Sequence, residues 1–272
     1  MSDWPQSLVL AGAGKMGGAM LRGWLAAGLA PAGVVVIDPL PSSDIIALSI
    51  SAGFAINREG KIIQPEVLVL AIKPQTLDAA AQDLAKIAGP QTLVLSIMAG
   101  KTIADLRARL SRARAFVRAM PNTPAAVGRG AAAGFANGAV SDVQRAWAER
   151  LMRAVGQFDW LDDEALIDAV TAISGSGPAY IFALVEAMAK AGEAVGLPAD
   201  LAMRLARATV EGAGELLYRE PETPAAKLRA NVTSPAGTTA AALAVLQAPG
   251  GLEALIIKAA AAAHRRAGEL AG

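Results

Sequence analysis

The chain has 272 residues, more than half of them apolar, and a formal net charge of +1, so it is long enough for one large domain or two ordinary ones. It has no cysteine, which excludes disulfides, thiolate nucleophiles and Cys-ligated metals, and it has no basic stripe with interleaved aromatic residues, which argues against a nucleic-acid partner. Residues 1–5 lack the basic segment of a signal peptide, and no uninterrupted apolar run reaches about 18 residues, so we expect a cytoplasmic protein that does not span a membrane.

Short apolar runs alternate with helical stretches in the first part of the chain. The runs read as strands are Leu8–Ala11, Val34–Asp38, Val67–Ile72, Thr92–Ile97, Ala115–Arg118 and Ala131–Phe135. The helical stretches are 17–27, 76–88, 103–110 and 141–155. Strands that are apolar almost throughout are typical of a parallel sheet covered on both faces. The pattern predicts an α/β fold in which an N-terminal Rossmann-type doubly wound sheet precedes a second domain.

After about Asp163 the pattern becomes helical. The segment Tyr180–Val195 places apolar side chains on one helical face, with Ser176 and Pro178 as a helix start and Gly196 as its end. Further helices are expected over 198–218, 239–246 and 252–267, with a polar connection over 222–230. We therefore predict a dinucleotide-binding domain over 1–163 and an all-α domain over 164–272. The second is small and rich in Ala and Gly, which favours pairing with a second copy, as a homodimer.

A glycine-rich turn follows the first strand. Gly12 allows a tight turn, Gly14 lets the backbone approach a phosphate, and Gly17 allows the next helix to pack closely. Lys15 and Met16 lie between the last two glycines, at the helix N-terminus, where free N–H groups favour negative charge. An ordinary strand–helix turn is the alternative interpretation.

Asp38 ends the second strand, where an acidic side chain would bind the ribose hydroxyls of NAD. Ser42 and Ser43 would instead suit a 2′-phosphate, so the choice between NADH and NADPH stays open. Capping of the strand end is an equal alternative for Asp38.

Three later strand ends carry small or polar residues. They are Ala71-Ile72-Lys73-Pro74, Ser96–Gly100 and Arg118–Pro124. Ligands of such folds bind beyond the carboxyl ends of the strands, so we expect Lys73 to face the cofactor and Ala99 and Gly100 to admit a nicotinamide ring. A solvated Lys73 and a proline-bounded turn at 121–124 are the alternatives.

A second turn of small residues lies far downstream, at Asn231–Thr239. Its backbone amides and hydroxyls suit a small anion such as a carboxylate, and the following helix N-terminus adds positive potential. The alternative is a plain N-cap made by Thr238 or Thr239. The only histidine, His264, is expected to be a solvated residue of the last helix, which argues against a His-based relay or metal site.

Two sequence blocks complete the pattern: Thr171–Tyr180, which contains Ser-Gly-Ser-Gly-Pro-Ala-Tyr, and Asn231–Thr239, which contains Val-Thr-Ser-Pro. With Lys73-Pro74 and Met120–Pro124, these blocks closely resemble pyrroline-5-carboxylate reductase over nearly the whole chain. The resemblance implies NADPH- or NADH-dependent reduction of 1-pyrroline-5-carboxylate to L-proline, the last step of proline biosynthesis. It also implies a helical dimerisation domain and, in many members, a ring of dimers (a decamer).

The resemblance further implies roles for individual residues. Substrate binding falls to Ser234, Gly237, Thr238 and Thr239, and the Thr239 hydroxyl faces the ring nitrogen as the catalytic group. Asn57 matches a cofactor-ribose contact, Glu222 an acidic residue near the substrate, and Asn122 lies in the Met-Pro-Asn-Thr-Pro block at the cofactor edge. We expect Ser174–Pro178 to cap the long helix, with Ser176 as a substrate contact.

The sequence departs from the family pattern at two positions. Ala230 stands where members usually carry Asp, and Ala236 where they carry Gly; a side chain at 236 makes a positive φ difficult. Two other functions stay open. A hydroxy-acid dehydrogenase of the 6-phosphogluconate type needs a base on the long helix, where only Lys190 is available, and a non-catalytic NAD(P) sensor needs no anion turn.

Overall fold

The computed structural model describes residues 4–57 and 64–271, and the predicted absence of a signal peptide therefore concerns a segment whose residues 1–3 lie outside the described part. By contacts the chain divides into two compact units. The first comprises residues 1–176 and 263–272, and the second residues 177–262. The sequence predicts a boundary at 163/164, and that boundary stays a prediction.

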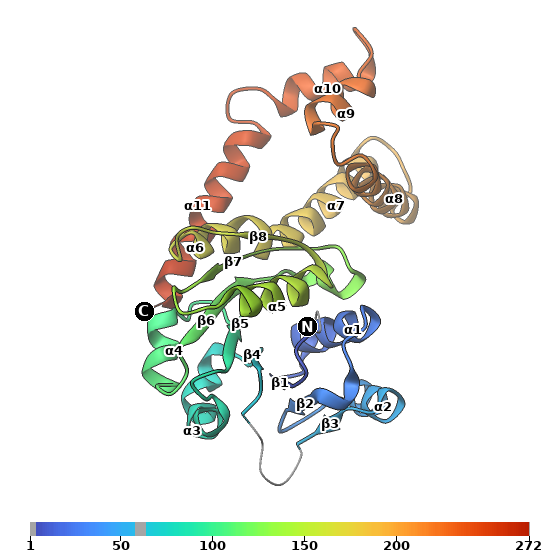
Figure 1. Ribbon diagram of the computed structural model, residues 1–272. Helices are drawn as coiled ribbons and strands as arrows, with labels where there is room; N and C mark the ends of the chain where they lie inside the picture. Colours follow the sequence, from blue (N-terminus) through green and yellow to red (C-terminus); the bar gives the residue numbers. More distant parts are fainter. Residues whose placement is uncertain (1–3, 58–63, 272) are drawn as a thin grey trace. The chain divides into compact units, whose positions relative to one another are not determined.

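The first unit is built on one sheet (Figure 1). Within the described residues its strands are β1 (Leu8–Ala11), β2 (Val34–Ile37), β3 (Ala55–Ile56), β4 (Val67–Leu70), β5 (Leu93–Ser96), β6 (Ala115–Met120), β7 (Gly130–Ala136) and β8 (Gly156–Trp160). Their order is β3-β2-β1-β4-β5-β6-β7-β8, and every neighbouring pair is parallel except β6 with β7. The predicted Rossmann-type doubly wound sheet is confirmed, with one antiparallel junction.

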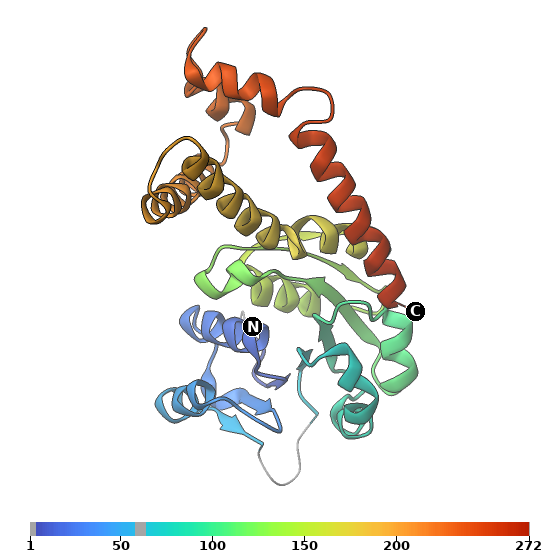
Figure 2. The ribbon, with the colours of Figure 1, turned by 180° about the vertical axis from the view of Figure 1, so that it is seen from behind.

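Helices lie on both faces of this sheet (Figure 1, and Figure 2 from behind). They are α1 (Lys15–Ala26), α2 (Ser43–Ala52), α3 (Leu77–Ile87), α4 (Ile103–Arg109) and α5 (Asp142–Arg153). Alternate strand residues enter two separate cores: Leu8 and Leu10 pack in the core that holds Trp24 of α1, and Val9 in the one that holds Leu84 of α3. Burial on both faces explains why the strands are apolar almost throughout.

The segment after the sheet differs from the prediction. A helix begins at α6 (Leu166–Val170), passes through a π-helical segment, η4 (Thr171–Gly175), and continues as α7 (Gly177–Ala194). The predicted helix start at Ser176 and Pro178 agrees with the first residue of α7, Gly177, but α7 continues a helical run that begins at Leu166 and that the sequence did not predict. Ser176 lies within the helical run, and its N–H donates to the Thr171 carbonyl at 2.8 Å, the spacing of a π-helix.

The second unit is helical, as predicted. Besides α7 it contains α8 (Ala199–Arg219), α9 (Ala225–Asn231), α10 (Thr238–Leu246) and the start of α11 (Leu252–Ala271). α9 occupies most of the predicted polar connection, because Pro224 serves as its N-cap and Ala and Lys are good helix formers. Gly196 ends α7 with a φ of +101°, as expected of a helix C-cap glycine.

Many large apolar side chains of these helices are exposed in a single chain. Ile181, Phe182 and Leu184 are 46%, 63% and 41% exposed, and the only buried residue of α7 is Ala189. The helical run Leu166–Ala194 is long and apolar enough to cross a membrane by length and composition, which is weak evidence by itself. An apolar surface of this kind indicates a protein interface or a membrane contact.

Candidate functional site

The glycine turn after β1 has the geometry that its sequence predicts. Gly12 has a φ of +90°, and a Cβ on it would lie 2.7 Å from the carbonyl oxygen of Ala71. A Cβ on Gly17 would lie 2.1 Å from the carbonyl oxygen of Gly12. The space around Gly14 is open, because no heavy atom lies within 4 Å of its ideal Cβ. Two glycines therefore shape the turn, and the third leaves room for a ligand.

The same turn presents unsatisfied backbone donors. Gly14 is the N-cap of α1, no side chain caps this helix end, and the first α-helical hydrogen bond runs from Gly18 N–H to the Gly14 carbonyl at 2.8 Å. The amides of Lys15, Met16 and Gly17 precede that bond, at the positive end of the helix dipole. This open cradle of N–H groups fits a diphosphate.

Asp38 is bound to the turn rather than free in solvent. One carboxylate oxygen accepts a hydrogen bond from Ala13 N–H at 2.8 Å, and the other accepts one from Leu40 N–H at 2.9 Å. The two bonds use one lone pair on each oxygen, so each oxygen can accept a second donor. Strand-end capping, one of the two alternatives for Asp38, is therefore present, and it leaves the acceptor capacity that a ribose needs.

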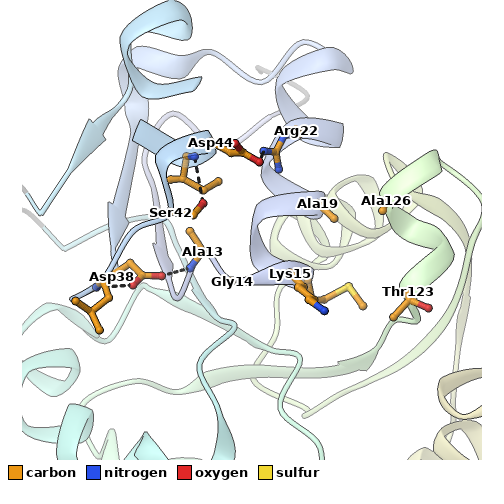
Figure 3. A pocket seen from close by; sticks show the side chains of 13 residues that line it. Ala13, Gly14, Lys15, Ala19, Arg22, Asp38, Ser42, Asp44, Thr123 and Ala126 are labelled. Atoms are coloured by element: carbon orange, nitrogen blue, oxygen red, sulfur yellow. Dashed lines mark hydrogen bonds and ion pairs between the residues drawn. The ribbon is translucent and has the colours of Figure 1, made fainter. Parts of the chain in front are cut away.

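A cavity of about 650 Å³ lies over this turn (Figure 3). Its walls come from the turn, from β2 and α2, and from the segment after β6. The polar residues that line it are Lys15, Arg22, Asp38, Ser42, Asp44 and Thr123. Arg22 lies 3.9 Å from Asp44, and both side chains are largely exposed. The cavity therefore has one carboxylate held rigidly in its wall, that of Asp38, and a looser pair of opposite charges beside it.

A second cavity, of about 490 Å³, opens on the α3 side of the strand ends. Its lining is mostly apolar and includes Ile37, Ile72 and Leu84, together with Asn57. Asn57 has a φ of +46°, and its amide exchanges two hydrogen bonds with the Asp38 backbone, at 2.9 and 2.6 Å. Asn57 thus belongs to the same strand-end structure as Asp38, on the side where a flat apolar ring has room.

The remaining strand-end candidates separate into packed and exposed residues. Ala71 packs beneath the turn, against Gly12 and Gly17, and Pro74 opens a short 3₁₀ helix, η2 (Pro74–Thr76). Lys73 and Ala99 are exposed. Gly100 is covered by the end of α11, since a Cβ on it would meet the Leu270 carbonyl oxygen at 2.7 Å. Of the predicted nicotinamide platform, only Ala99 is therefore open to a ligand.

Asn122 is buried, with 7% of its surface exposed. Its side-chain N–H₂ donates to the Ser174 carbonyl at 3.0 Å, and its side-chain oxygen accepts from Ala131 N–H at 2.9 Å. The predicted cofactor residue thus uses its amide inside the fold, while Thr123, the next residue, lines the cavity over the glycine turn.

The second small-residue turn precedes α10. Ala236 has a φ of +57°, so this position holds the left-handed conformation, which the sequence predicts to be difficult for a residue with a side chain. Gly237 is the N-cap and no side chain caps α10, so the alternative of a capping Thr238 or Thr239 is wrong. The amides of residues 238–240 precede the first helical hydrogen bond, from Ala241 N–H to the Gly237 carbonyl at 3.2 Å.

The hydroxyls of this turn are available to a ligand. Over residues 64–271, which the structure describes, neither Thr238 nor Thr239 has a side-chain hydrogen bond, and Ser234 Oγ lies against Gly237, where a Cβ would approach it to 2.3 Å. Ser176 is half-buried, whereas Glu222, Lys190 and His264 are exposed. The described residues contain no cluster of three or more His, Cys, Asp or Glu with the geometry of a metal site.

One part of the cavity wall is not predicted by the sequence. Asp44 lies in the first turn of α2, an unpredicted helix, because the Pro39–Ser43 stretch suggests only a loop. The available signal was Ser42, whose hydroxyl caps the helix by accepting a hydrogen bond from Ile45 N–H at 3.4 Å.

Comparison with known families gives two matches along the chain. Residues 164–270 match the pyrroline-5-carboxylate reductase dimerisation family, and residues 7–100 match a family described as NADP oxidoreductase, coenzyme F420-dependent. The first match begins at the residue where we predicted the second domain to begin. It also covers the exposed apolar helices.

Individual relatives match over almost their whole length. The chain is 44% identical to a pyrroline-5-carboxylate reductase of Pseudomonas aeruginosa, covering 96% of this chain and 95% of that one. It is 35% identical to one of Pisum sativum over 95% of this chain and 94% of the other.

Among solved structures, a pyrroline-5-carboxylate reductase from Coxiella burnetii has a TM-score of 0.90 and 37% identity, covering 98% and 99% of the two chains. A pyrroline carboxylate reductase from Plasmodium falciparum, solved with NADP bound, has a TM-score of 0.78 and 25% identity over 98% of each.

Proposed function

Since this chain belongs to the pyrroline-5-carboxylate reductase family, we propose that its glycine turn holds NAD(P)H and that its second small-residue turn holds the substrate carboxylate. The activity is the NAD(P)H-dependent reduction of 1-pyrroline-5-carboxylate to L-proline in proline biosynthesis. The observation that supports the cofactor assignment is the open space beside Gly14. This space leaves the unbonded amides at the start of α1 accessible to a diphosphate.

The cofactor site groups the strand-end residues of the first unit. The α1 amides and Gly14 bind the diphosphate, Asp38 and Asn57 the adenosine ribose, and the apolar cavity beside Ile72 and Leu84 the adenine. The other residues assigned to this site are Gly12, Lys15, Met16, Gly17, Ala71, Lys73, Pro74 and Ala99. Gly12, Gly17 and Ala71 serve it by shaping the turn rather than by touching the ligand.

The substrate site is the turn before α10. Its amides at 238–240 and the hydroxyls of Ser234 and Thr238 bind the carboxylate of 1-pyrroline-5-carboxylate, and the α10 dipole favours the negative charge. A Cβ on Gly237 would lie 2.3 Å from Ser234 Oγ, so a larger residue at position 237 would displace the Ser234 hydroxyl. Ser176 and Glu222 are secondary substrate candidates.

The chemistry needs few protein groups. Bound NAD(P)H supplies the hydride to the imine carbon, and one proton on the ring nitrogen completes the reduction of the C=N bond to the amine. If the substrate binds as the protonated iminium, no strong acid is required. The Thr239 hydroxyl then holds the N–H by accepting its hydrogen bond. This agrees with a chain without cysteine and with a single, exposed histidine.

The quaternary structure follows from the dimerisation family. The chain pairs as a homodimer through its C-terminal region, and we propose that the exposed faces of α7 and α8 are covered by the second copy rather than by lipid. A boundary at 163/164, a decamer built as a ring of dimers, and a cytoplasmic location are further parts of the proposal.

A direct test replaces the proposed catalytic hydroxyl. Reduced-nicotinamide absorbance is followed with 1-pyrroline-5-carboxylate, using NADH and NADPH in parallel. We expect Thr239→Ala to lower kcat about 10- to 1000-fold with the fold intact. Thr233→Ala is the matched control, since within the described residues the Thr233 hydroxyl bonds only the Arg229 carbonyl, at 2.7 Å. Equal rates for Thr239→Ala and wild type would remove Thr239 from the mechanism.

A further inference from the structure

The side chain of Asn122 joins two segments that are distant in the sequence. Its oxygen accepts the N–H of Ala131, at the start of β7, and its N–H₂ donates to the carbonyl of Ser174, in η4. The residue is buried and directly precedes Thr123 in the wall of the cofactor cavity. Asn122 thus links that wall to the π-helical segment.

The carbonyl that Asn122 contacts has lost its ordinary partner. In an α-helix the Ser174 carbonyl would accept the N–H of the residue four positions later, which is Pro178, and proline has no N–H. A carbonyl left without a donor in a half-buried position is costly. The Asn122 amide supplies the donor that Pro178 lacks.

Neighbouring residues of β6 contact the same helical run. Arg118, 4% exposed, forms an ion pair with Glu164 at 2.8 Å, and the same Glu164 oxygen accepts Ile103 N–H at 2.7 Å. The Met120 side chain lies 3.7 Å from where a Cβ on Gly175 would be. Arg118 and Met120, on one face of β6, and Asn122, just beyond its end, therefore contact the segment from Glu164 to Gly175.

We propose that Asn122 is a positioning residue of the reductase: by holding the Ser174 carbonyl it fixes the π-helical segment η4, which directly precedes Ser176. The proposal rests on the proposed function for its kinetic consequence, since Ser176 is a substrate candidate in that function. It assigns no contact between Asn122 and the cofactor.

The expected kinetic effect is on substrate turnover rather than on nucleotide binding. A displacement of about 1 Å at a positioning element can cost about 100-fold in rate. We therefore expect Asn122→Ala to lower kcat/KM for 1-pyrroline-5-carboxylate about 10- to 100-fold. The NADPH dissociation constant, measured by titration without substrate, stays at the wild-type value.

A second asparagine offers a matched control. Asn137 also bridges two backbone groups of this sheet, since its side chain accepts Phe116 N–H at 3.0 Å and donates to the Arg114 carbonyl at 2.9 Å. These bonds are made at the start of β6 and just before it, and neither involves η4. Asn137→Ala therefore removes two comparable bonds and leaves the contact with η4 intact. Asn122→Asp, which keeps the acceptor for Ala131 and removes the donor, replaces Asn122→Ala if the latter does not fold.

Rescue separates positioning from general destabilisation. Pro178→Ala returns an N–H to position 178, so the double variant Asn122→Ala/Pro178→Ala has a new donor for the Ser174 carbonyl. We expect it to recover most of the lost kcat/KM. Hydrogen exchange of residues 171–176 provides a readout that needs no activity: exchange is faster in Asn122→Ala, slower again in the double variant, and unchanged in Asn137→Ala.

Three results would each overturn the proposal. One is a loss of NADPH affinity in step with the loss of activity, which would make Asn122 a cofactor ligand. Another is an equal fall in kcat/KM in Asn137→Ala. The third is unchanged exchange over 171–176 in Asn122→Ala. If wild type did not reduce 1-pyrroline-5-carboxylate, the exchange experiment would still decide the positioning role, so the two failures are distinguishable.

Discussion

The Asp38 carboxylate accepts the N–H of Ala13 at 2.8 Å, which ties the end of β2 to the glycine turn after β1. A second bond, from Leu40 N–H at 2.9 Å, holds its other oxygen. The carboxylate is therefore fixed in the wall of the cavity over the glycine turn. In the proposed cofactor site, a ribose 2′-hydroxyl would donate to it and a 2′-phosphate would be repelled.

This contact predicts a nucleotide preference that the sequence left open. We expect kcat/KM to be higher with NADH than with NADPH, and Asp38→Asn to shift the ratio toward NADPH by about tenfold, because like charges at close range cost about 1 kcal/mol or more. The ratio is measured with both nucleotides at saturating substrate. Asp44→Asn serves as the control, since Asp44 lines the same cavity but is 80% exposed. A ratio that Asp38→Asn leaves unchanged would contradict the prediction.

We expect substitutions of Gly14 and Gly17 in the turn to cause two different kinds of defect. Gly14→Ala should fold normally, because nothing lies within 4 Å of its ideal Cβ, and should weaken NADPH binding about 10-fold or more, because the methyl group occupies the approach of the diphosphate. Gly17→Ala should instead destabilise the fold, since its Cβ would lie 2.1 Å from the Gly12 carbonyl oxygen. Thermal unfolding and nucleotide titration of both variants separate the effects.

Much of the first unit is predictable because its strands are buried on both faces. The Leu8–Ala11 strand has the bounds that the apolar run predicts, and the glycine turn after it has the predicted geometry. In contrast, β3 has two residues and β8, Gly156–Trp160, mixes polar with apolar residues, so neither gives an apolar run. α2 was missed because its polar N-terminal segment suggests a loop.

The candidate site was harder to predict where it depends on contacts between distant residues. The Asn122–Ser174 bond joins residues 52 positions apart, and the local sequence gives no sign of it. Pro178 indicated the start of α7, which does begin at Gly177, but it gave no sign that α6 and η4 precede α7 in the same helical run. Gly100 was expected to leave room for a nicotinamide ring. The local sequence could not show that Leu270 of α11, 170 positions later, packs against it.

We expect the contribution of Glu149 to the free energy of unfolding to depend on pH. The Trp160 indole N–H, at 3.0 Å, and the Arg153 guanidinium, at 2.7 Å, lower the pKa of this carboxyl below its ordinary value near 4.5. A lowered pKa in the folded state means that the stabilisation is present above the ordinary pKa and is lost as the pH falls through the folded-state pKa. Glu149→Gln should therefore lower the free energy of unfolding by about 1 kcal/mol at pH 7, with the difference vanishing in acid.

Urea unfolding of wild type and Glu149→Gln at neutral and acid pH measures this difference. The control is Glu269→Gln, which breaks an exposed ion pair with Arg266 and should change little at either pH. A difference that persists unchanged in acid would mean that Glu149 acts by packing rather than by charge.

Ala236 has a φ of +57°, which is unfavourable for a residue with a side chain. The left-handed conformation costs a non-glycine residue about 1–2 kcal/mol, and a substitution by glycine removes this cost. Glycine also makes the unfolded chain more flexible, which offsets about 0.4–1 kcal/mol of the gain. Ala236→Gly should therefore raise the free energy of unfolding by about 0.5 kcal/mol. Ala242→Gly, the same change at an exposed site inside α10, should lower it by about 1 kcal/mol. Urea unfolding compares the two, and a loss of stability in both variants would show that the turn before α10 gains nothing from glycine.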